Sequence, residues 1–253
     1  MHMDTSFRSL FELPRSRRGQ GFTLVEMLVV ISIASILSIL VTMGFQSIVG
    51  SAYDGQISNI ASTLSRARAY AMANNTYVFV GIQEVSAANS SNGTQTSGTG
   101  RIAIAVLASS DGTRGYQTSI STSTVLTSLN VVSPLRQYEN LHLATSAGTV
   151  ISNLPNTSVT GATYEAASTT ALTSFNWPIG ASSSQYPTFG SNGTVIQFDP
   201  QGEAQIVTGP YTDSNLQWIE IDLIPTHGTK VSANNPATIL IDGTSGSVTT
   251  YRE

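Results

Sequence analysis

The most unusual ionisable residue in this sequence is Glu26, because it is the one charged side chain in the apolar run 22–45. As a helix rising about 1.5 Å per residue, a run of this length crosses the roughly 30 Å hydrocarbon core of a bilayer. A charge at mid-membrane costs roughly 2.5 to 3.5 kcal/mol, so a carboxylate there normally has a partner and a function. We therefore expect Glu26 to pair with a cation. The simpler alternatives are that it snorkels to the interface or is protonated.

The residues on either side of this run differ in charge. Arg15, Arg17 and Arg18 precede it, and no Lys or Arg follows it until Arg66. The positive-inside rule then places the N-terminus in the cytoplasm and the bulk of the chain across the membrane. A secretory signal peptide is the competing interpretation, but its apolar core is shorter and ends at a small-residue cleavage site. A plain signal anchor leaves Glu26 unexplained.

The motif GFTLVE at residues 21–26 closely resembles the type III signal of type IV pilins and type II secretion pseudopilins. The resemblance implies that prepilin peptidase cleaves between Gly21 and Phe22 and that the new amine of Phe22 is methylated. It also implies that Glu26 pairs with the Phe22 ammonium of a neighbouring subunit during assembly. Such a pair attracts more strongly in lipid than in water, so it would select register while apolar packing supplies adhesion.

The helical pattern continues beyond the apolar run to about Asn74. Apolar residues recur there at three- and four-residue spacing and predict a stripe that packs on an outer domain: Ile57, Ile60, Ala61, Leu64, Ala67, Ala71 and Met72. We expect a break near Gly44, Gly50 or Gly55, since glycine costs about 1 kcal/mol against alanine in a helix.

Beyond Asn74 the sequence favours β-structure. Strands are predicted at 76–85, 101–108, 194–198, 204–207, 216–224, 238–241 and 247–251, with weaker candidates at 126–132, 137–144 and 149–154. The alternation IEIDL at 219–223 predicts a strand with one wet face. Residues 199–202 and 242–246 are expected to form turns between neighbouring strands.

The predicted fold class is α+β: a long N-terminal transmembrane-plus-amphipathic helix packed on an antiparallel sheet or sandwich, which resembles the pilin fold. The expected organisation is a leader at 1–21, a transmembrane helix at 22–45, its amphipathic continuation at 46–74 and a periplasmic β-rich domain at 75–253. Within the pilin group, the sequence looks most like the general secretion protein H family of minor pseudopilins. Three segments carry this resemblance: LSRARAYAMANNTYVFV, TVIQFDPQGEAQIV and ILIDGTSGSVTTYR. The lack of cysteine is consistent with that family and excludes a disulfide.

Composition argues against several other function classes. Charged residues make up 10% of the chain and its formal net charge is −4. The leader through Gly21 carries +2, so the processed chain would be −6 and would offer no basic tract to nucleic acid. His142 and His227 stand outside any HExxH or nucleophile motif, and we expect no catalytic residue, metal or cofactor. The segments 111–113 and 242–246 could offer oxygens to calcium, but they lack the spaced acids of a calcium loop, which favours turns.

Two functions from different classes follow. The first is a minor pseudopilin or minor pilin, stored in the bacterial inner membrane as a single-pass protein and then built into a type II secretion pseudopilus or type IV pilus. Its partners would be other pilin subunits, prepilin peptidase, the inner-membrane assembly platform and the lipid bilayer. The alternative is a membrane-anchored extracytoplasmic β-domain that acts as an adhesin or ligand-binding module.

Overall fold

The computed structural model describes residues 22–112, 114, 129–144, 151, 154, 164–166, 175–179, 181, 184–190, 193–206, 218–232 and 234–252. The predicted leader at 1–21 lies outside these residues. The chain divides into two compact units, Met1–Val49 and Gly50–Glu253. The second unit contains the β-structure, and α1 (Leu24–Asn74) supplies helix to both units.

The helix α1 ends at Asn74, as the sequence predicts. Asn75 adopts a left-handed conformation with φ 48°, and Thr76 N donates to Ala71 O at 3.1 Å. This is the Schellman arrangement, in which a residue tolerant of positive φ closes the last turn and turns the chain toward the first strand. The predicted glycine break is wrong, because α1 passes through Gly44, Gly50 and Gly55 as helix. One glycine costs only about 1 kcal/mol, which the helix on either side offsets.

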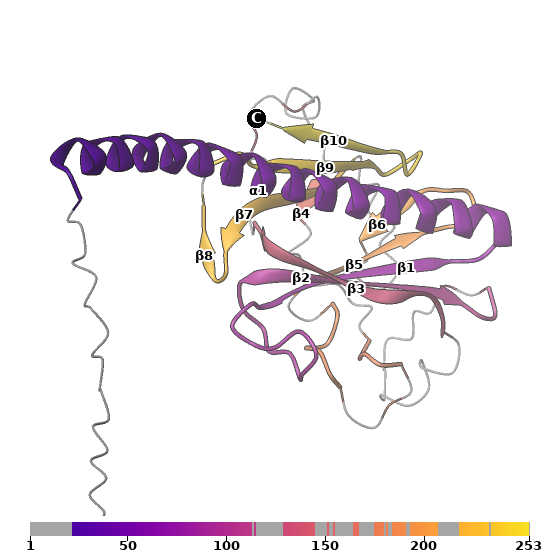
Figure 1. The fold of residues 1–253 in the computed structure, drawn as a ribbon. Helices are drawn as coiled ribbons and strands as arrows, with labels where there is room; N and C mark the ends of the chain where they lie inside the picture. The colour runs from indigo at the N-terminus through magenta and orange to yellow at the C-terminus, as the bar shows by residue number, and fades with distance from the viewer. Residues whose placement is uncertain are drawn as a thin grey trace, which may run out of the picture. The chain divides into compact units, whose positions relative to one another are not determined.

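In the second unit, α1 lies across one face of the sheet (Figure 1). Its buried stripe repeats every three or four residues and comprises Tyr53, Ile57, Ile60, Leu64, Ala67 and Ala71. The predicted stripe is therefore confirmed for most members. Ala61 is only half-buried against the core, and Met72 is the exception, since it is 39% exposed. Its sulfur instead lies against the turn at Gly202, where a Cβ would come within 2.8 Å of it.

Ten strands are described, and eight of them run in the order β10-β9-β7-β3-β2-β1-β5-β6, with β4 and β8 pairing with β7. Their bounds are β1 Val78–Ser86, β2 Gly100–Ser109, β3 Leu129–Leu143, β4 Tyr164–Ala166, β5 Gly193–Phe198, β6 Ala204–Ile206, β7 Trp218–His227, β8 Lys230–Val231, β9 Ala237–Asp242 and β10 Val248–Arg252. All described pairs are antiparallel except β4 with β7. The α+β class is confirmed.

The strand β3 joins two segments that the sequence predicts separately. Pro134 lies within it, and the register against β2 shifts between the pairs Ile104↔Arg136 and Val106↔Ser133. Pro134 lacks an N–H, but β3 pairs with β7 only at its other end, residues 141–143. The proline is tolerated because it sits at a bulge on an edge stretch of the strand. The candidate at 149–154 lies mostly outside the described residues.

The expectation of a wet face on β7 is wrong. Ile219 and Ile221 are buried in the main core, but Glu220 and Asp222 are also buried, at 0% and 2% exposure. Leu240 pairs with Glu220 and is buried outside that main cluster. This part of the sheet is therefore covered on both faces, which an alternating pattern in one strand does not reveal.

The two ends of the strand order approach each other. Ala204, at the start of β6, donates its N–H to Gly243 O in the β9–β10 turn at 2.8 Å. Gly246 of the same turn lies so close to Gly202 that a Cβ on it would be 2.0 Å from the Gly202 oxygen. Arg68 of α1 donates to that oxygen at 3.3 Å. The helix and both glycine turns thus meet at one point.

Candidate functional site

The N-terminal motif is only partly within the described residues. Gly21 and the arginines Arg15, Arg17 and Arg18 lie outside them, whereas Phe22 and Glu26 lie inside. Phe22 precedes α1 and is 72% exposed. Glu26 lies in the first turn of the helix.

Thr23 and Glu26 form a reciprocal pair at the start of α1. The Thr23 hydroxyl accepts from Glu26 N at 3.2 Å, and the Glu26 carboxylate lies 3.5 Å from Thr23 N as a weak acceptor. Met27 N donates to Thr23 O at 3.1 Å, which closes the first helical turn. This is a capping box, in which threonine at the N-cap and glutamate three residues later satisfy otherwise orphaned N–H groups. Within one subunit, Glu26 therefore already has a local role.

The serines in the apolar part of α1 satisfy their own hydroxyls. Ser32, Ser35 and Ser38 each donate to the carbonyl four residues earlier, at 2.7 to 2.8 Å. A hydroxyl bonded in this way needs no water, as an apolar environment requires.

The described side chains from 22 to 39 are all exposed. The large apolar ones among them are Phe22, Leu24, Val25, Met27, Leu28, Val29, Val30, Ile31, Ile33, Ile36, Leu37 and Ile39. A contiguous apolar surface of this kind marks contact with a membrane or another protein. By the criteria of length, hydropathy and charge, no helix among the described residues is long and apolar enough to cross a membrane.

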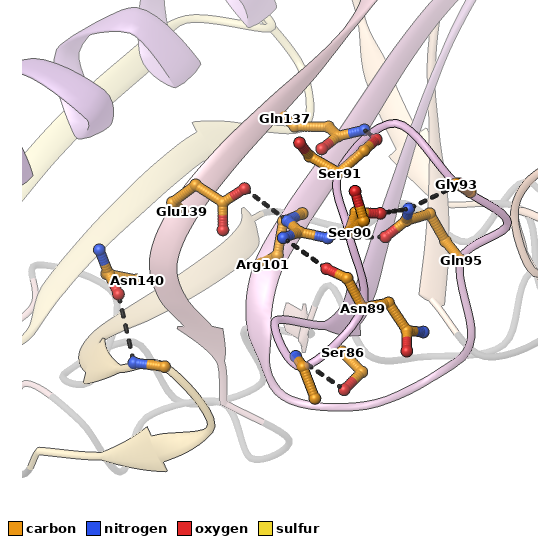
Figure 2. Close-up of polar contacts among 12 residues, drawn as sticks. Ser86, Asn89, Ser90, Ser91, Gly93, Gln95, Arg101, Gln137, Glu139 and Asn140 are labelled. Carbon is orange, nitrogen blue, oxygen red and sulfur yellow. Dashed lines mark hydrogen bonds and ion pairs between the residues drawn. The ribbon is translucent and has the colours of Figure 1, made fainter.

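A second polar cluster centres on Arg101 of β2, which is 4% exposed (Figure 2). Its guanidinium donates to Glu139 at 2.6 Å, to the Gln95 side chain at 2.7 Å and to Asn89 O at 3.0 Å. Gln95 in turn donates to Ser90 O and Gly93 O. The guanidinium thus holds the 87–99 loop against the sheet. Because its neighbours already bind it, this cluster is structural.

His142 of β3 pairs with Glu84 of β1, its Nδ1 lying 2.9 Å from one carboxylate oxygen. Glu84 also accepts from Gly100 N at 3.1 Å. The hydrogen bond that His142 Nδ1–H donates to Glu84 raises the pKa of His142 above its usual value, although partial burial acts in the opposite direction. His227 is exposed at the end of β7. Neither histidine lies beside a nucleophile among these contacts.

Glu220 and Asp222 form a buried acidic pair on one face of β7. The Thr238 hydroxyl donates to Asp222 from the paired position on β9. Burial raises the pKa of Asp222 to about 7, against the lowering effect of the Thr238 hydrogen bond, and the charge of Glu220 raises it further. This carboxyl is therefore protonated far more readily than an ordinary aspartate.

The segment 242–246 is a turn held by its own aspartate. Asp242 Oδ1 accepts from Thr244 N at 2.8 Å and from Ser245 N at 3.1 Å, and Gly246 N donates to Asp242 O at 2.7 Å. Burial acts to raise the pKa of Asp242, but hydrogen bonds from Thr244 and Ser245 outweigh it and lower the pKa overall. The turn interpretation is confirmed. Among the described residues, no three His, Asp or Glu side chains group as metal ligands.

Comparison with known protein families gives one result for the N-terminal region. Residues 16–42 match the family model described as the prokaryotic N-terminal methylation motif. The chain carries a prepilin-type N-terminus. The matched range includes Gly21, Phe22 and Glu26, and it supports placement in the type IV pilin and pseudopilin superfamily. Such a motif implies a membrane-anchored N-terminus. Comparisons with curated proteins and with solved structures gave no match.

The sequence patterns discussed above did not predict two features of these sites, the capping box at the start of α1 and the buried acidic pair of β7. The capping box could have been found, because a threonine followed three residues later by glutamate before an apolar run is its signature. The buried acidic pair could not have been found from the β7 sequence, which looks like that of a half-exposed strand.

Proposed function

We propose that this chain is a minor pilin or pseudopilin, a structural subunit that prepilin peptidase cleaves between Gly21 and Phe22. The mature N-terminus would carry a methylated Phe22 amine, and residues 22–45 would hold the subunit in the inner membrane with its C-terminal unit in the periplasm. Assembly would then place it in a type II secretion pseudopilus or a type IV pilus.

The methylation motif carries this proposal. The exposed apolar surface of 22–39 supports it, because that surface needs either lipid or neighbouring helices to cover it. Both environments are available to a pilin-type subunit, first in the membrane and then in the filament. The family comparison does not support the alternative of a membrane-anchored ligand-binding module.

Two features of the structure support the finer assignment to the general secretion protein H family, because each lies in a sequence segment that resembles that family. The segment TVIQFDPQGEAQIV contains β5, a glycine turn and β6, paired through Ile196↔Ile206. The arginine-bearing end of α1 passes directly into β1 through the Asn75 cap. Both agree with the layout expected from that family resemblance.

The test is the N-terminal peptide of the membrane-extracted protein, measured by mass spectrometry from cells with and without prepilin peptidase. We expect a peptide that begins at N-methylated Phe22 only when the peptidase is present. An intact leader in both strains, or cleavage beyond Phe45, would overturn the proposal.

A further inference from the structure

A pocket of about 220 Å³ lies between α1 and the strands β2 and β3, within the unit Gly50–Glu253. It is remote in sequence from the N-terminal motif and shares no residue with the Arg101 cluster. Its lining consists of Thr63, Arg66, Ala67, Tyr70, Val106, Val132, Ser133 and Arg136.

Two arginines from different elements line this pocket. Arg66 comes from α1 and Arg136 from β3, and both are exposed. Within the described residues neither forms an ion pair, whereas Arg101 is paired with Glu139 and Arg252 with Asp54. The whole chain has only 11 Lys and Arg, so two unpaired guanidiniums at one pocket do not reflect a generally basic surface. An anion placed between them would interact favourably with both charges.

The rest of the pocket wall is apolar or carries hydroxyls. Ala67 and Val106 are buried, and Val132 is half-buried. The Thr63 hydroxyl donates to Asn59 O at 2.8 Å, so it presents acceptor lone pairs. Tyr70, which is 38% exposed, adds a phenol. The available hydrogen-bond donors are therefore mainly the two guanidinium groups, whereas the buried part of the lining, Ala67 and Val106, is apolar.

The size of the pocket and its residue types indicate the class of ligand. A volume of about 220 Å³ is below the roughly 300 to 1,000 Å³ of drug-sized ligand pockets, but one or two side chains fit it. Arginine and tyrosine are the residues most enriched at the energetic centres of protein interfaces. Guanidinium groups recognise carboxylates through charge-assisted, often bidentate hydrogen bonds.

The geometry points to a docking site for an acidic peptide segment of another protein subunit, with a carboxylate held between Arg66 and Arg136 and an apolar side chain against the half-buried Val132. The identity of the partner as a fellow filament subunit rests on the proposed function. The binding of an acidic peptide does not rest on the proposed function, because it depends only on the residues that line the pocket.

The test uses the full chain in detergent with ¹⁵N-labelled arginine, and follows the arginine Nε–Hε signals by NMR. The probe is a capped pentapeptide with two glutamates around a valine, and the matched control peptide has glutamines in their place. We expect the acidic peptide to shift the Arg66 and Arg136 signals saturably while those of Arg101 and Arg252 stay fixed. An exposed ion pair is worth at most about 1 kcal/mol, so Arg66→Gln or Arg136→Gln should each raise the Kd about fivefold.

The control variant is Lys230→Gln, which removes one exposed positive charge outside the pocket and should leave the Kd unchanged. No saturable shift, equal shifts of all arginines, or equal binding of the glutamine peptide would overturn the proposal. The N-terminus of the same sample is read by mass spectrometry. An intact leader with normal peptide binding would reject the proposed function alone, and a processed N-terminus without binding would reject the pocket alone.

Discussion

Glu26 has two roles that can be separated by substitution, one within the subunit and one proposed between subunits. Thr23→Ala removes the N-cap hydroxyl but leaves the carboxylate, and costs about 1 kcal/mol of helix stability. Glu26→Ala removes the carboxylate and its weak hydrogen bond with Thr23 N, but leaves the bond from the residue-26 N–H to the Thr23 hydroxyl in place. We expect Thr23→Ala subunits to enter filaments and Glu26→Ala subunits to remain in the membrane, as measured by immunoblotting of sheared filaments and membranes.

Filament entry by Glu26→Ala at the normal level would contradict an assembly role for the carboxylate. Equal loss of assembly in both variants would instead assign the effect to the capping box that Thr23 and Glu26 form together. Processing of the N-terminus serves as the control, because a variant that retains its leader reports on the peptidase and not on assembly.

The buried Asp222 makes stability depend on pH in a direction opposite to that of most acids. Its folded pKa of about 7 lies above the unfolded value of about 3.9, so the folded state binds more protons between these values. The stabilisation is complete below about pH 4 and is lost as the pH rises to about 7. Urea unfolding across this range should show a falling free energy of unfolding.

Asp222→Asn should flatten that slope, because an amide cannot titrate. Asp54→Asn is the matched control, since Asp54 is exposed and pairs with Arg252 at the surface. Persistence of the slope in Asp222→Asn would assign it to another group.

At the scale of single elements, replacing glycine by alanine should have opposite effects on stability at two positions, one in β1 and one in α1. A Cβ on Gly81 of β1 would lie 2.5 Å from Phe175 Cζ and 2.9 Å from Phe189 Cδ1, and these two buried rings stack with centroids 5.0 Å apart. We expect Gly81→Ala to cost about 1 to 3 kcal/mol through overpacking. Gly55→Ala in α1 meets nothing within 4 Å and should stabilise by about 1 kcal/mol.

Urea midpoints of the two variants check this prediction. A neutral Gly81→Ala would mean that the Phe175 and Phe189 rings can move aside. A destabilising Gly55→Ala would mean that this exposed helical face has a partner.

The elements themselves could largely be predicted from sequence, because helix period, strand composition and turn residues are local signals. The stripe from Ile57 to Ala71 and the turn at Asp242 are examples. The rest depends on non-local packing. Pro134 suggests a strand boundary, yet β3 pairs with β7 only at residues 141–143, which leaves Pro134 on an edge stretch that accommodates it. The burial of Glu220 depends on what covers the second face of the sheet. At the N-terminus, the prepilin-type motif could be recognised from the sequence, and the site residues within it stay a prediction.

For the whole molecule, the end of α1 belongs to the folded C-terminal unit. Ile57, Ile60 and Leu64 are at most 1% exposed within its core. Losing one such side chain costs about 2 to 5 kcal/mol, and a domain is stable by only about 5 to 15 kcal/mol. We expect a 50–253 fragment to unfold cooperatively and a 75–253 fragment not to fold, as measured by near-ultraviolet circular dichroism during urea titration.

Cooperative folding of 75–253 would contradict this and would show that the sheet is stable without the helix. Ile60→Ala in the 50–253 fragment is the graded control, and should lower stability without abolishing the transition.

The contact between β6 and the β9–β10 turn affects how readily a strand of another molecule can pair with this edge of the sheet. An open sheet offers unpaired backbone groups at both edges, and these recruit strands from other molecules into aggregates. Here the Ala204 N–H of one terminal strand is bonded to Gly243 O of the turn at the opposite end. With this N–H already bonded, β6 has one donor fewer to offer to a strand of another molecule, which favours association through the helix and side-chain surfaces instead.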